Sequence, residues 1–508
     1  MNRSVYAVGK PIRGTTVCTA ILLVFTGLPL PAQTFTTLHS FEVSDSKNPE
    51  AGLIEATNGE LYGTGANGGA NSEGTAFKIT RAGALTALYN FCSQPNCADG
   101  ATPSAALLQA GDQTLYGTTS SAGANSFYAE YGTVFKMTPA GALTTIYSFC
   151  SQPNCTDGAG PLAGLTEAAD GNFYGTTGVG GVNQTCFLGC GTVFQITPAG
   201  VLTTLYNFCS EPNCTDGSDP EAGLVPASNG DLYGTTQGGG ANGQGTIFQM
   251  TPTGGFTTIY NFCSQTNCTD GAGPVAALVE GVDGNLYGTT ATGGSNCLPD
   301  GCGTLFKITL GGQLTTLYSF CAQANCADGK YPSAGLIQAT DGNFYGTTKA
   351  AGANSSYAEY GTIFRITPGG TVTTLYNFCS EANCADGDGP LAELVQATDG
   401  KFYGTTVMGG IYNSHLGGAG TVFRLSVGLE PFVKTNIHAG KVGQSVKIIG
   451  GNLTGATSVT FDGTAAAFTV HSDSSIFTAV PAGSTSGEVQ VTTPQGKFSS
   501  NVPFHVLP

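Results

Sequence analysis

Three short motifs recur along the chain at a nearly constant interval, and this repetition limits the possible folds more than any other feature. The first motif, (L/F)YGT, gives successive spacings of 54, 58, 59, 54, 58 and 58 residues and is marked by Tyr62, Tyr116, Tyr174, Tyr233, Tyr287, Tyr345 and Tyr403. The second, GT-x-F, begins at Gly74, Gly132, Gly191, Gly245, Gly303, Gly361 and Gly420. The third resembles TTLYNF and occurs at residues 36–41 and around Tyr89, Tyr147, Tyr206, Tyr260, Tyr318 and Tyr376. We number the repeats as units 1 to 7 in the order of their (L/F)YGT motifs.

Each unit contains four runs of residues with strand character. In unit 3 they are residues 163–168, 172–177, 191–197 and 201–208. Asp170 and Gly171 join the first two runs in a tight-hairpin sequence, and a short Pro-Ala-Gly turn joins the last two. Four meandering strands per unit at this period predict an all-β fold, a seven-bladed β-propeller. A solenoid would need shorter repeats, and a string of sandwiches would need longer ones.

The two ends of the repeat array complement each other. The array begins with a TTLYNF-type strand at residues 36–41 and ends with a GT-x-F strand at residues 420–426, so unit 7 lacks its own fourth strand. We expect the N-terminal strand to pair with residues 420–426 and to close the ring, because closure removes exposed strand edges.

The pattern LYGTT…GTVFKITPAG…LTTLYNF resembles the GloVer tandem repeat of bacterial exported proteins, over residues 35 to 427. The resemblance implies a protein of the cell exterior, since such repeats are combined with various surface-anchoring or sorting tails. It implies no enzyme activity.

After residue 428 the repeat motifs disappear. Strand-like runs follow at residues 445–449, 458–461, 467–470, 488–492 and 503–506, with a hairpin signal at Asp462 and Gly463. This pattern predicts a small β-sandwich. The segments KIIGGNLTGATSVTFDGTAAAFTV and VPAGSTSGEVQVTTPQG resemble the IPT/TIG immunoglobulin-like domain, which implies a spacer or interaction module. We therefore expect a propeller at residues 34–428 and an IPT/TIG-like domain at residues 429–508.

Residues 1–33 have the features of a signal peptide. Arg3, Lys10 and Arg13 are basic, and the 12 apolar residues 17–28 that follow are too few to span a bilayer comfortably. We expect cleavage near Ala32, with an uncleaved anchor as the alternative. The mature protein is then exported, as an extracellular, periplasmic or cell-surface protein with no transmembrane helix.

The cysteines also favour export. Of 17 cysteines, Cys18 lies in the leader and the other 16 form close pairs: Cys92 and Cys97, Cys150 and Cys155, Cys186 and Cys190, Cys209 and Cys214, Cys263 and Cys268, Cys297 and Cys302, Cys321 and Cys326, and Cys379 and Cys384. Such pairs in an exported chain predict disulfide bonds. Metal thiolates are the alternative, but they need four converging ligands, and no histidine accompanies the pairs. We expect no metal.

The charge and the histidines limit the function further. A net charge of −16 excludes nucleic acid as an expected partner, since phosphate binding needs clustered Lys and Arg. The five histidines, His39, His415, His438, His471 and His505, are scattered. We predict no catalytic residue and no cofactor, and we expect a monomer.

One face of the propeller is the predicted place for binding. The loops between the second and third strands share this face with the connectors that carry the cysteine pairs. These loops have 9 residues in units 1 and 4 and 13 or 14 in the others. Variable loops on a rigid scaffold commonly bind ligands. Units 2 and 6 offer side chains that can stack on a sugar or a peptide, namely Tyr128, Glu130, Tyr131, Tyr357, Glu359 and Tyr360. The alternative is that these side chains pack on neighbouring loops.

Each connector also carries an aspartate before a glycine: Asp99, Asp157, Asp216, Asp270, Asp328 and Asp386. One carboxylate per blade suggests calcium, but the D-x-D-x-D-G pattern is missing. An Asp-Gly turn beside a disulfide explains the motif more simply.

These observations predict an exported, non-catalytic binding or cell-surface interaction protein whose extracellular ligand is a glycan or a protein. A polysaccharide- or glycoside-cleaving enzyme is the first alternative, because the separation of two carboxylates is invisible in a sequence. A structural envelope component is the second.

Overall fold

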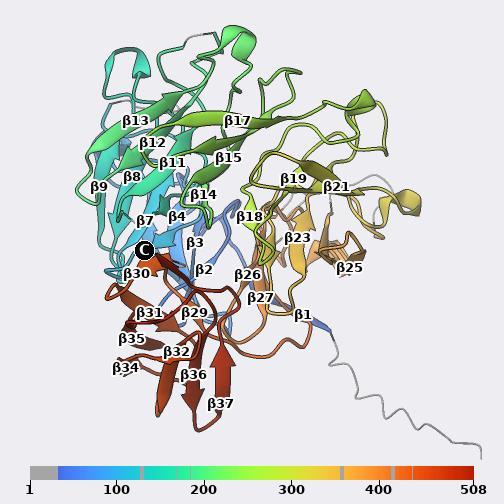
Figure 1. Cartoon of the computed structure of the whole chain (residues 1–508). Coiled ribbons are helices and arrows are strands. Elements are labelled where there is room, and N and C mark those ends of the chain that lie inside the picture. Colours follow the sequence, from blue (N-terminus) through green and yellow to red (C-terminus); the bar gives the residue numbers. More distant parts are fainter. Residues whose placement is uncertain are drawn as a thin grey trace, which may run out of the picture.

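The computed structural model describes residues 33–125, 131–168, 170–183, 185–354, 360–412, 418–437 and 439–507. It is an all-β protein built from repeated four-stranded antiparallel sheets, followed by a smaller group of strands (Figure 1). Among the described residues, no helix has both the length and the apolar character needed to cross a bilayer.

The sheets of units 1 to 6 share one strand order, in which each strand pairs with the next one along the chain. In units 1 to 3 the strands are β2 (Ile54–Glu55), β3 (Leu61–Gly65), β4 (Thr75–Ile79) and β5 (Leu85–Asn90); β6 (Leu108–Gln109), β7 (Leu115–Thr119), β8 (Thr133–Met137) and β9 (Leu143–Ser148); β10 (Thr166–Glu167), β11 (Phe173–Thr177), β12 (Thr192–Ile196) and β13 (Leu202–Asn207). In units 4 to 6 they are β14 (Val225–Pro226), β15 (Leu232–Thr236), β16 (Thr246–Met250) and β17 (Phe256–Asn261); β18 (Val279–Glu280), β19 (Leu286–Thr290), β20 (Thr304–Ile308) and β21 (Leu314–Ser319); β22 (Ile337–Gln338), β23 (Phe344–Thr348), β24 (Thr362–Ile366) and β25 (Val372–Asn377).

The predicted four strands per unit are present, but the first strand is shorter than expected. In unit 3 the predicted run 163–168 contributes only β10, Thr166–Glu167. The residues before it face a neighbouring unit, because a Cβ added to Gly164 would lie 2.9 Å from the carbonyl oxygen of Ala106. These residues pack against the preceding unit and do not extend the ladder.

The sheet of unit 7 is completed by the N-terminal strand. Its order is β1 (Thr34–Ser40), β28 (Thr421–Ser426), β27 (Phe402–Thr406) and β26 (Val395–Gln396). β1 and β28 are antiparallel, with Thr34 opposite Ser426 and Ser40 opposite Thr421. The pairing that the complementary ends of the array predict is therefore confirmed.

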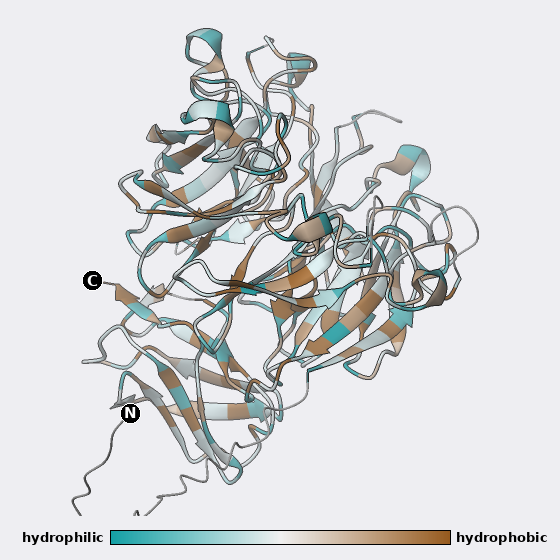
Figure 2. Cartoon of the chain, turned by 90° about the vertical axis from the view of Figure 1, so that its right-hand side faces the viewer, coloured by the Kyte–Doolittle hydropathy of each residue, from teal (hydrophilic) through white to brown (hydrophobic). Residues whose placement is uncertain are grey.

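The hydrophobic cores lie between neighbouring sheets. All five residues of β3 are buried, as are those of its equivalents, and the strands carry much of the hydrophobic colour in Figure 2. Tyr62 and Phe91 of unit 1 share one cluster with Leu115 and Phe135 of unit 2. Units 7 and 1 make the same kind of contact, through a cluster that includes Phe77 and Tyr403, among others.

A glycine in the (L/F)YGT motif permits this packing. A Cβ on Gly234 would lie only 2.4 Å from Cζ of Phe248, the phenylalanine of the GT-x-F motif in the paired strand. The ring therefore lies directly over the glycine, which explains why the two motifs recur together.

A polar contact also links neighbouring sheets near their first strands. The amide of Thr57 donates to Oε1 of Gln109 at 2.8 Å, and the amide of Ser228 donates to Oε2 of Glu280 at 2.8 Å. At the joint between units 7 and 1, the amide of Thr398 donates to Oε2 of Glu55 at 3.0 Å. The last unit therefore contacts the first through the same kind of bond.

The C-terminal strands form a two-sheet β-sandwich. One sheet contains β29 (Lys434–Thr435), β31 (Ser445–Ile449), β35 (Ser475–Ala479) and β34 (Phe468–Ser472); the other contains β33 (Thr464–Ala465), β32 (Ser458–Phe461), β36 (Val489–Thr493) and β37 (Gly496–Ser499). A parallel pair joins β30 (Ala439–Lys441) and β38 (His505–Leu507). Both sheets contribute to one core, which includes Ile448 and Val491. The sequence did not predict β35 and β37.

The sandwich is bonded to the hairpin side of the repeat sheets. Nζ of Lys434 lies 2.9 Å from Oε2 of the buried Glu55, which also pairs with Arg81. Oγ of Ser474 donates to the carbonyl oxygen of Thr57 at 2.7 Å. The amide of Phe432 donates to the carbonyl oxygen of Thr398 at 3.0 Å. In Figure 1 the red strands of the sandwich accordingly lie next to β2 and β3.

Candidate functional site

The loops between the second and third strands lie beside the cysteine-bearing connectors. In unit 2, Ala101 of the connector forms an antiparallel bridge with Ser121 of the loop, and the amide of Gly123 donates to the carbonyl of Cys97 at 3.1 Å. Equivalent bridges join Lys47 to Asn67, Ala159 to Val179, Ser218 to Gly238, Ala272 to Thr292, Lys330 to Ala350 and Asp388 to Met408. We call this side of the sheets the loop face.

Disulfide bonds close short turns in the connectors. They join Cys92 to Cys97, Cys150 to Cys155, Cys209 to Cys214, Cys263 to Cys268, Cys321 to Cys326 and Cys379 to Cys384, and two more in the loops join Cys186 to Cys190 and Cys297 to Cys302. These are the pairs that the spacing predicts. Each connector turn includes one 3-10 turn: η1 (Pro95–Cys97), η2 (Pro153–Cys155), η3 (Pro212–Cys214), η4 (Thr266–Cys268), η5 (Ala324–Cys326) or η6 (Ala382–Cys384).

The connector aspartates are buried and hold these turns together. Oδ2 of Asp99 accepts hydrogen bonds from the hydroxyl of Tyr89 at 2.8 Å and from the amide of Ser93 at 2.9 Å. Its Oδ1 accepts from the amide of Gln94 at 3.1 Å. The same contacts recur at Asp157, Asp216, Asp270, Asp328 and Asp386.

Protein donors therefore occupy both oxygens of each carboxylate, which favours the structural interpretation of these aspartates over calcium binding. Burial, together with the carboxylate of Asp157, raises the pKa of Tyr147 to about 12. A phenol with such a pKa stays protonated and keeps donating. The sequence pointed to an Asp-Gly turn but missed the tyrosine of the TTLYNF motif as its partner.

Of the predicted binding residues, Tyr131 and Tyr360 are described, whereas Tyr128, Glu130, Tyr357 and Glu359 lie outside the described residues. The two described side chains are half-buried, and both residues directly precede a GT-x-F motif. The carbonyl of Tyr131 accepts from the amide of Gly160 at 2.9 Å, and that of Tyr360 accepts from Gly389 at 3.1 Å. The loop face thus places each tyrosine beside the next connector.

The inner edges of the sheets bring together a second set of residues that differ between units. Each unit has an Ala-x-Leu segment just before its first strand, and x is Gly52, Ala106, Gly164, Gly223, Ala277, Gly335 and Glu393. A Cβ on Gly52 would lie 3.0 Å from the carbonyl oxygen of Glu393, so units 1 and 7 meet at these positions. Glu393 is the single charged residue in this set.

The Glu393 side chain reaches toward unit 6, since a Cβ on Gly335 would lie 3.0 Å from its Oε2. The Glu393 side chain is only half-buried, but the protein around it partly desolvates the carboxyl, and this desolvation raises its pKa to about 7. A carboxyl with this pKa exchanges protons near neutral pH, as general acids and bases do. The sequence reasoning missed Glu393, although aligning the seven Ala-x-Leu segments would have found it.

Acidic residues with raised pKa values also precede two of these segments. Glu50 has an exposed side chain, yet partial desolvation of its carboxyl raises the pKa of Glu50, with a hydrogen bond from Ser104 opposing the shift. Burial also raises the pKa of Glu221, and the neighbouring carboxylate of Asp219 adds to that effect. Glu50 and Glu221 occupy one repeat position, at which the other units have Ser, Leu or Val.

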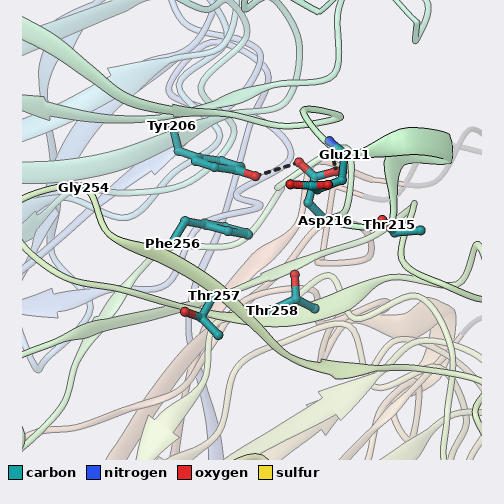
Figure 3. A pocket seen from close by; sticks show the side chains of 8 residues that line it. All are labelled: Tyr206, Glu211, Thr215, Asp216, Gly254, Phe256, Thr257 and Thr258. Atoms are coloured by element: carbon teal, nitrogen blue, oxygen red, sulfur yellow. Dashed lines mark hydrogen bonds between the residues drawn. The ribbon is translucent and has the colours of Figure 1, made fainter.

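A surface groove of about 540 Å³ lies between the outer strands of units 3 and 4. Figure 3 shows the rings of Tyr206 and Phe256 lying parallel in it, with centroids 3.8 Å apart. The hydroxyl of Tyr206 donates to Asp216 at 2.8 Å, so these two polar groups of the groove are already bonded within the scaffold. The groove therefore lies at a joint between two units of the scaffold.

No curated protein matches the chain. Among solved structures, a fungal alcohol oxidase of the AA5 family in complex with copper is similar, with 12% identity over 94% of this chain and 99% of the other and a TM-score of 0.52. A putative 6-phosphogluconolactonase from Bacteroides uniformis has 16% identity over 68% of this chain and 88% of the other, with a TM-score of 0.43. At such identities, only the fold is shared: the first likeness shows a β-propeller-like fold, and the second adds no argument.

The sequence profile of the Gloeobacter/Verrucomicrobia repeat matches residues 24–225, 99–298, 186–423 and 262–480. These overlapping matches cover most of the chain, including all the repeated sheets. The chain therefore belongs to the Gloeobacter/Verrucomicrobia repeat family.

Proposed function

We propose that this is an exported, non-catalytic binding or cell-surface interaction protein whose ligand, a glycan or another protein, binds on the loop face. The observation that carries the proposal is the contrast between repeated and unrepeated residues. The repeated polar groups, such as Asp99 and its equivalents, are used up in bonds within the scaffold. The loop face collects residues that differ between units, and Tyr131 and Tyr360 are two of them.

The proposed architecture is a closed, seven-bladed propeller at residues 34–428, followed by an IPT/TIG-like domain at residues 429–508. The pairing of β1 with β28 supports closure, as does the bond from Thr398 to Glu55, which matches the bonds at other joints. The two-sheet core of the C-terminal strands supports an immunoglobulin-like domain.

Export with removal of the signal peptide near Ala32 is part of the proposal. The many disulfide bonds support it, because disulfides persist in oxidising compartments outside the cytoplasm.

The test is an array of glycans and surface proteins probed with residues 33–508, followed by product analysis for every ligand that binds. Binding without turnover supports the proposal, turnover favours an enzyme, and no binding favours a structural component. For a ligand that binds, the double variant Tyr131→Ala/Tyr360→Ala should weaken the affinity about tenfold, the loss of one to two kcal/mol typical of aromatic contacts. Val201→Ala, an exposed residue in a turn between third and fourth strands, is the control and should change nothing.

A glycan-cleaving enzyme remains the second candidate, and Glu393 is the observation that favours it. The pKa of Glu393, about 7, suits a general acid. In the other six Ala-x-Leu segments the equivalent residue is Gly or Ala. If the protein cleaves any glycan on the array, Glu393→Gln should abolish turnover while Glu430→Gln, a matched change outside this set, should not. Equal turnover in both variants would exclude Glu393 as the acid.

A further inference from the structure

In units 3 and 5 the loop cysteines converge with the connector cysteines. The sulfur atoms of Cys186, Cys190, Cys209 and Cys214 all lie within 4.8 Å of one another, and so do those of Cys297, Cys302, Cys321 and Cys326. Sγ of Cys186 lies 3.6 Å from Sγ of Cys209, which belongs to the other disulfide. The sequence favoured disulfides over metal thiolates because a thiolate site needs four converging ligands. In the structure, four cysteine sulfurs do converge, at two places.

Glycines in the two loops permit this approach. Gly189 directly precedes Cys190, and its φ of +94° belongs to the region that favours glycine. A Cβ on Gly189 would lie 2.3 Å from the carbonyl oxygen of Gly180 in the opposite arm of the loop. Gly301 precedes Cys302 in unit 5 and is constrained in the same way, since a Cβ on Gly301 would lie 2.1 Å from the carbonyl oxygen of Gly293. The folded loops thus deliver two extra sulfurs to the connector.

The spacing of the sulfurs suits a tetrahedral metal ion. Zinc bound by thiolates has Zn–S distances of about 2.3 Å, which places the sulfurs about 3.8 Å apart. Cys190 and Cys209 are buried in a cluster with Val193 and Phe208, so part of such a site would be shielded from water. Closed sets of four cysteines are typical of structural zinc sites.

We propose that each four-cysteine cluster exists in two forms: two disulfide bonds when oxidised, and a tetrathiolate site for Zn²⁺ when reduced. Each cluster takes up four electrons and four protons when its two disulfides become four thiols. A phosphine supplies two electrons per disulfide and becomes a phosphine oxide, with its oxygen drawn from water. One Zn²⁺ then replaces the four thiol protons, which are released.

The other cysteine pairs provide an internal control. In units 1, 2, 4 and 6 the connector pair has no loop pair beside it, so each offers two sulfurs, which is too few for a closed site. Within the described residues, two groups of four converging cysteines are found, so the reduced protein should bind two metal ions.

The test uses residues 33–508, reduced with a phosphine under argon, freed of the reductant and titrated with Co²⁺, whose visible spectrum reports tetrahedral thiolate ligation. We expect two Co²⁺ per chain with thiolate charge-transfer bands, displaced by Zn²⁺, and no such bands for the oxidised protein. Cys190→Ser should leave one Co²⁺ per chain, whereas Cys97→Ser, in the isolated pair of unit 1, should leave two. Circular dichroism checks that each variant folds.

If Cys190→Ser does not fold because its side chain is buried, Cys297→Ser in the exposed part of the second cluster replaces it, with the same expected loss of one ion. The proposal is overturned if the reduced protein shows no tetrathiolate spectrum. It is equally overturned if Cys97→Ser reduces the stoichiometry as much as the cluster variants do.

Discussion

At the scale of single residues, repeated side chains that look like ligands are occupied in holding the connectors. The carboxylate of Asp99 is buried and accepts bonds from a phenol and two backbone amides, and the chain repeats this arrangement in each disulfide-bearing connector. A buried carboxylate that lacked these donors would be costly, so the donors and the acid stabilise one another. Residues that differ between units, such as Glu393, take no part in these repeated bonds.

Replacing Asp99 with Asn should loosen its connector. The variant loses charge-assisted bonds worth about 1.5–3 kcal/mol, so the amides of Ser93 and Gln94 should exchange with solvent roughly 10 to 100 times faster. Hydrogen–deuterium exchange measured by mass spectrometry checks this. Asp112→Asn, at an exposed hairpin turn, is the control and should leave those amides unchanged. Unchanged exchange in Asp99→Asn would mean that the disulfide alone fixes the turn.

Glu55 should make the attachment of the sandwich sensitive to acid. Burial acts to raise its pKa, but the charges of Lys434 and Arg81 outweigh burial and hold the pKa below its ordinary value. Its contribution is therefore complete above the unfolded-state pKa of about 4.3 and disappears as the pH falls through the lower folded-state pKa. At pH 7 Glu55→Gln should cost about 3 kcal/mol and lower the melting temperature.

The melting temperatures of the protein and of Glu55→Gln should converge as the pH falls below about 4. Thermal unfolding followed between pH 7 and 3 gives this comparison. Glu60→Gln removes a more exposed ion pair with Lys78 and serves as the control, with a much smaller effect at every pH. A constant difference between Glu55→Gln and the parent across this range would show that the charge of Glu55 is not what matters.

At the scale of elements, β1 covers the outer edge of β28 that would otherwise be exposed. Phe35 of β1 stacks on Tyr376 of unit 6 with centroids 3.7 Å apart, so the strand also joins two units. An exposed edge strand pairs readily with other chains. The N-terminal segment thus belongs to the last sheet by hydrogen bonding and packs against the sheet of unit 6.

Removal of residues 33–41 should therefore lower the melting temperature and cause self-association through β28. Differential scanning fluorimetry and light scattering measure the two effects. The control is the chain that begins at residue 33 and keeps β1. A deletion variant that melts with the control and stays monomeric would show that β1 is dispensable.

Much of the fold, and little of the site, could be predicted from sequence. The period and the hairpin signals are local and predict four strands per unit, and the complementary ends of the repeat array predict the pairing of β1 with β28. The length of the first strands depends on the approach of a neighbouring unit, as at Gly164, and no local signal carries it. The bond between Tyr89 and Asp99 and the meeting of four cysteines also depend on segments brought together by folding.

At the scale of the whole molecule, the sandwich and the variable loops lie at opposite ends of the repeat strands. The C-terminal sandwich is bonded to the hairpin side, where Lys434 reaches Glu55. The loop face on the opposite side carries the loops whose length and composition vary between units. A ligand or a partner surface would therefore meet the loops while the sandwich remains on the other side.

Exchange of the long loops tests this account most directly. Residues 119–131 and 348–360 would be replaced by the nine-residue loop 236–244 of unit 4, and the parent and the exchanged protein would be compared on the same glycan and protein array. We predict that the parent binds a ligand without converting it and that the exchanged protein loses this binding while its melting temperature is unchanged. The account is contradicted if the parent binds nothing, or if the exchanged protein binds as well as the parent.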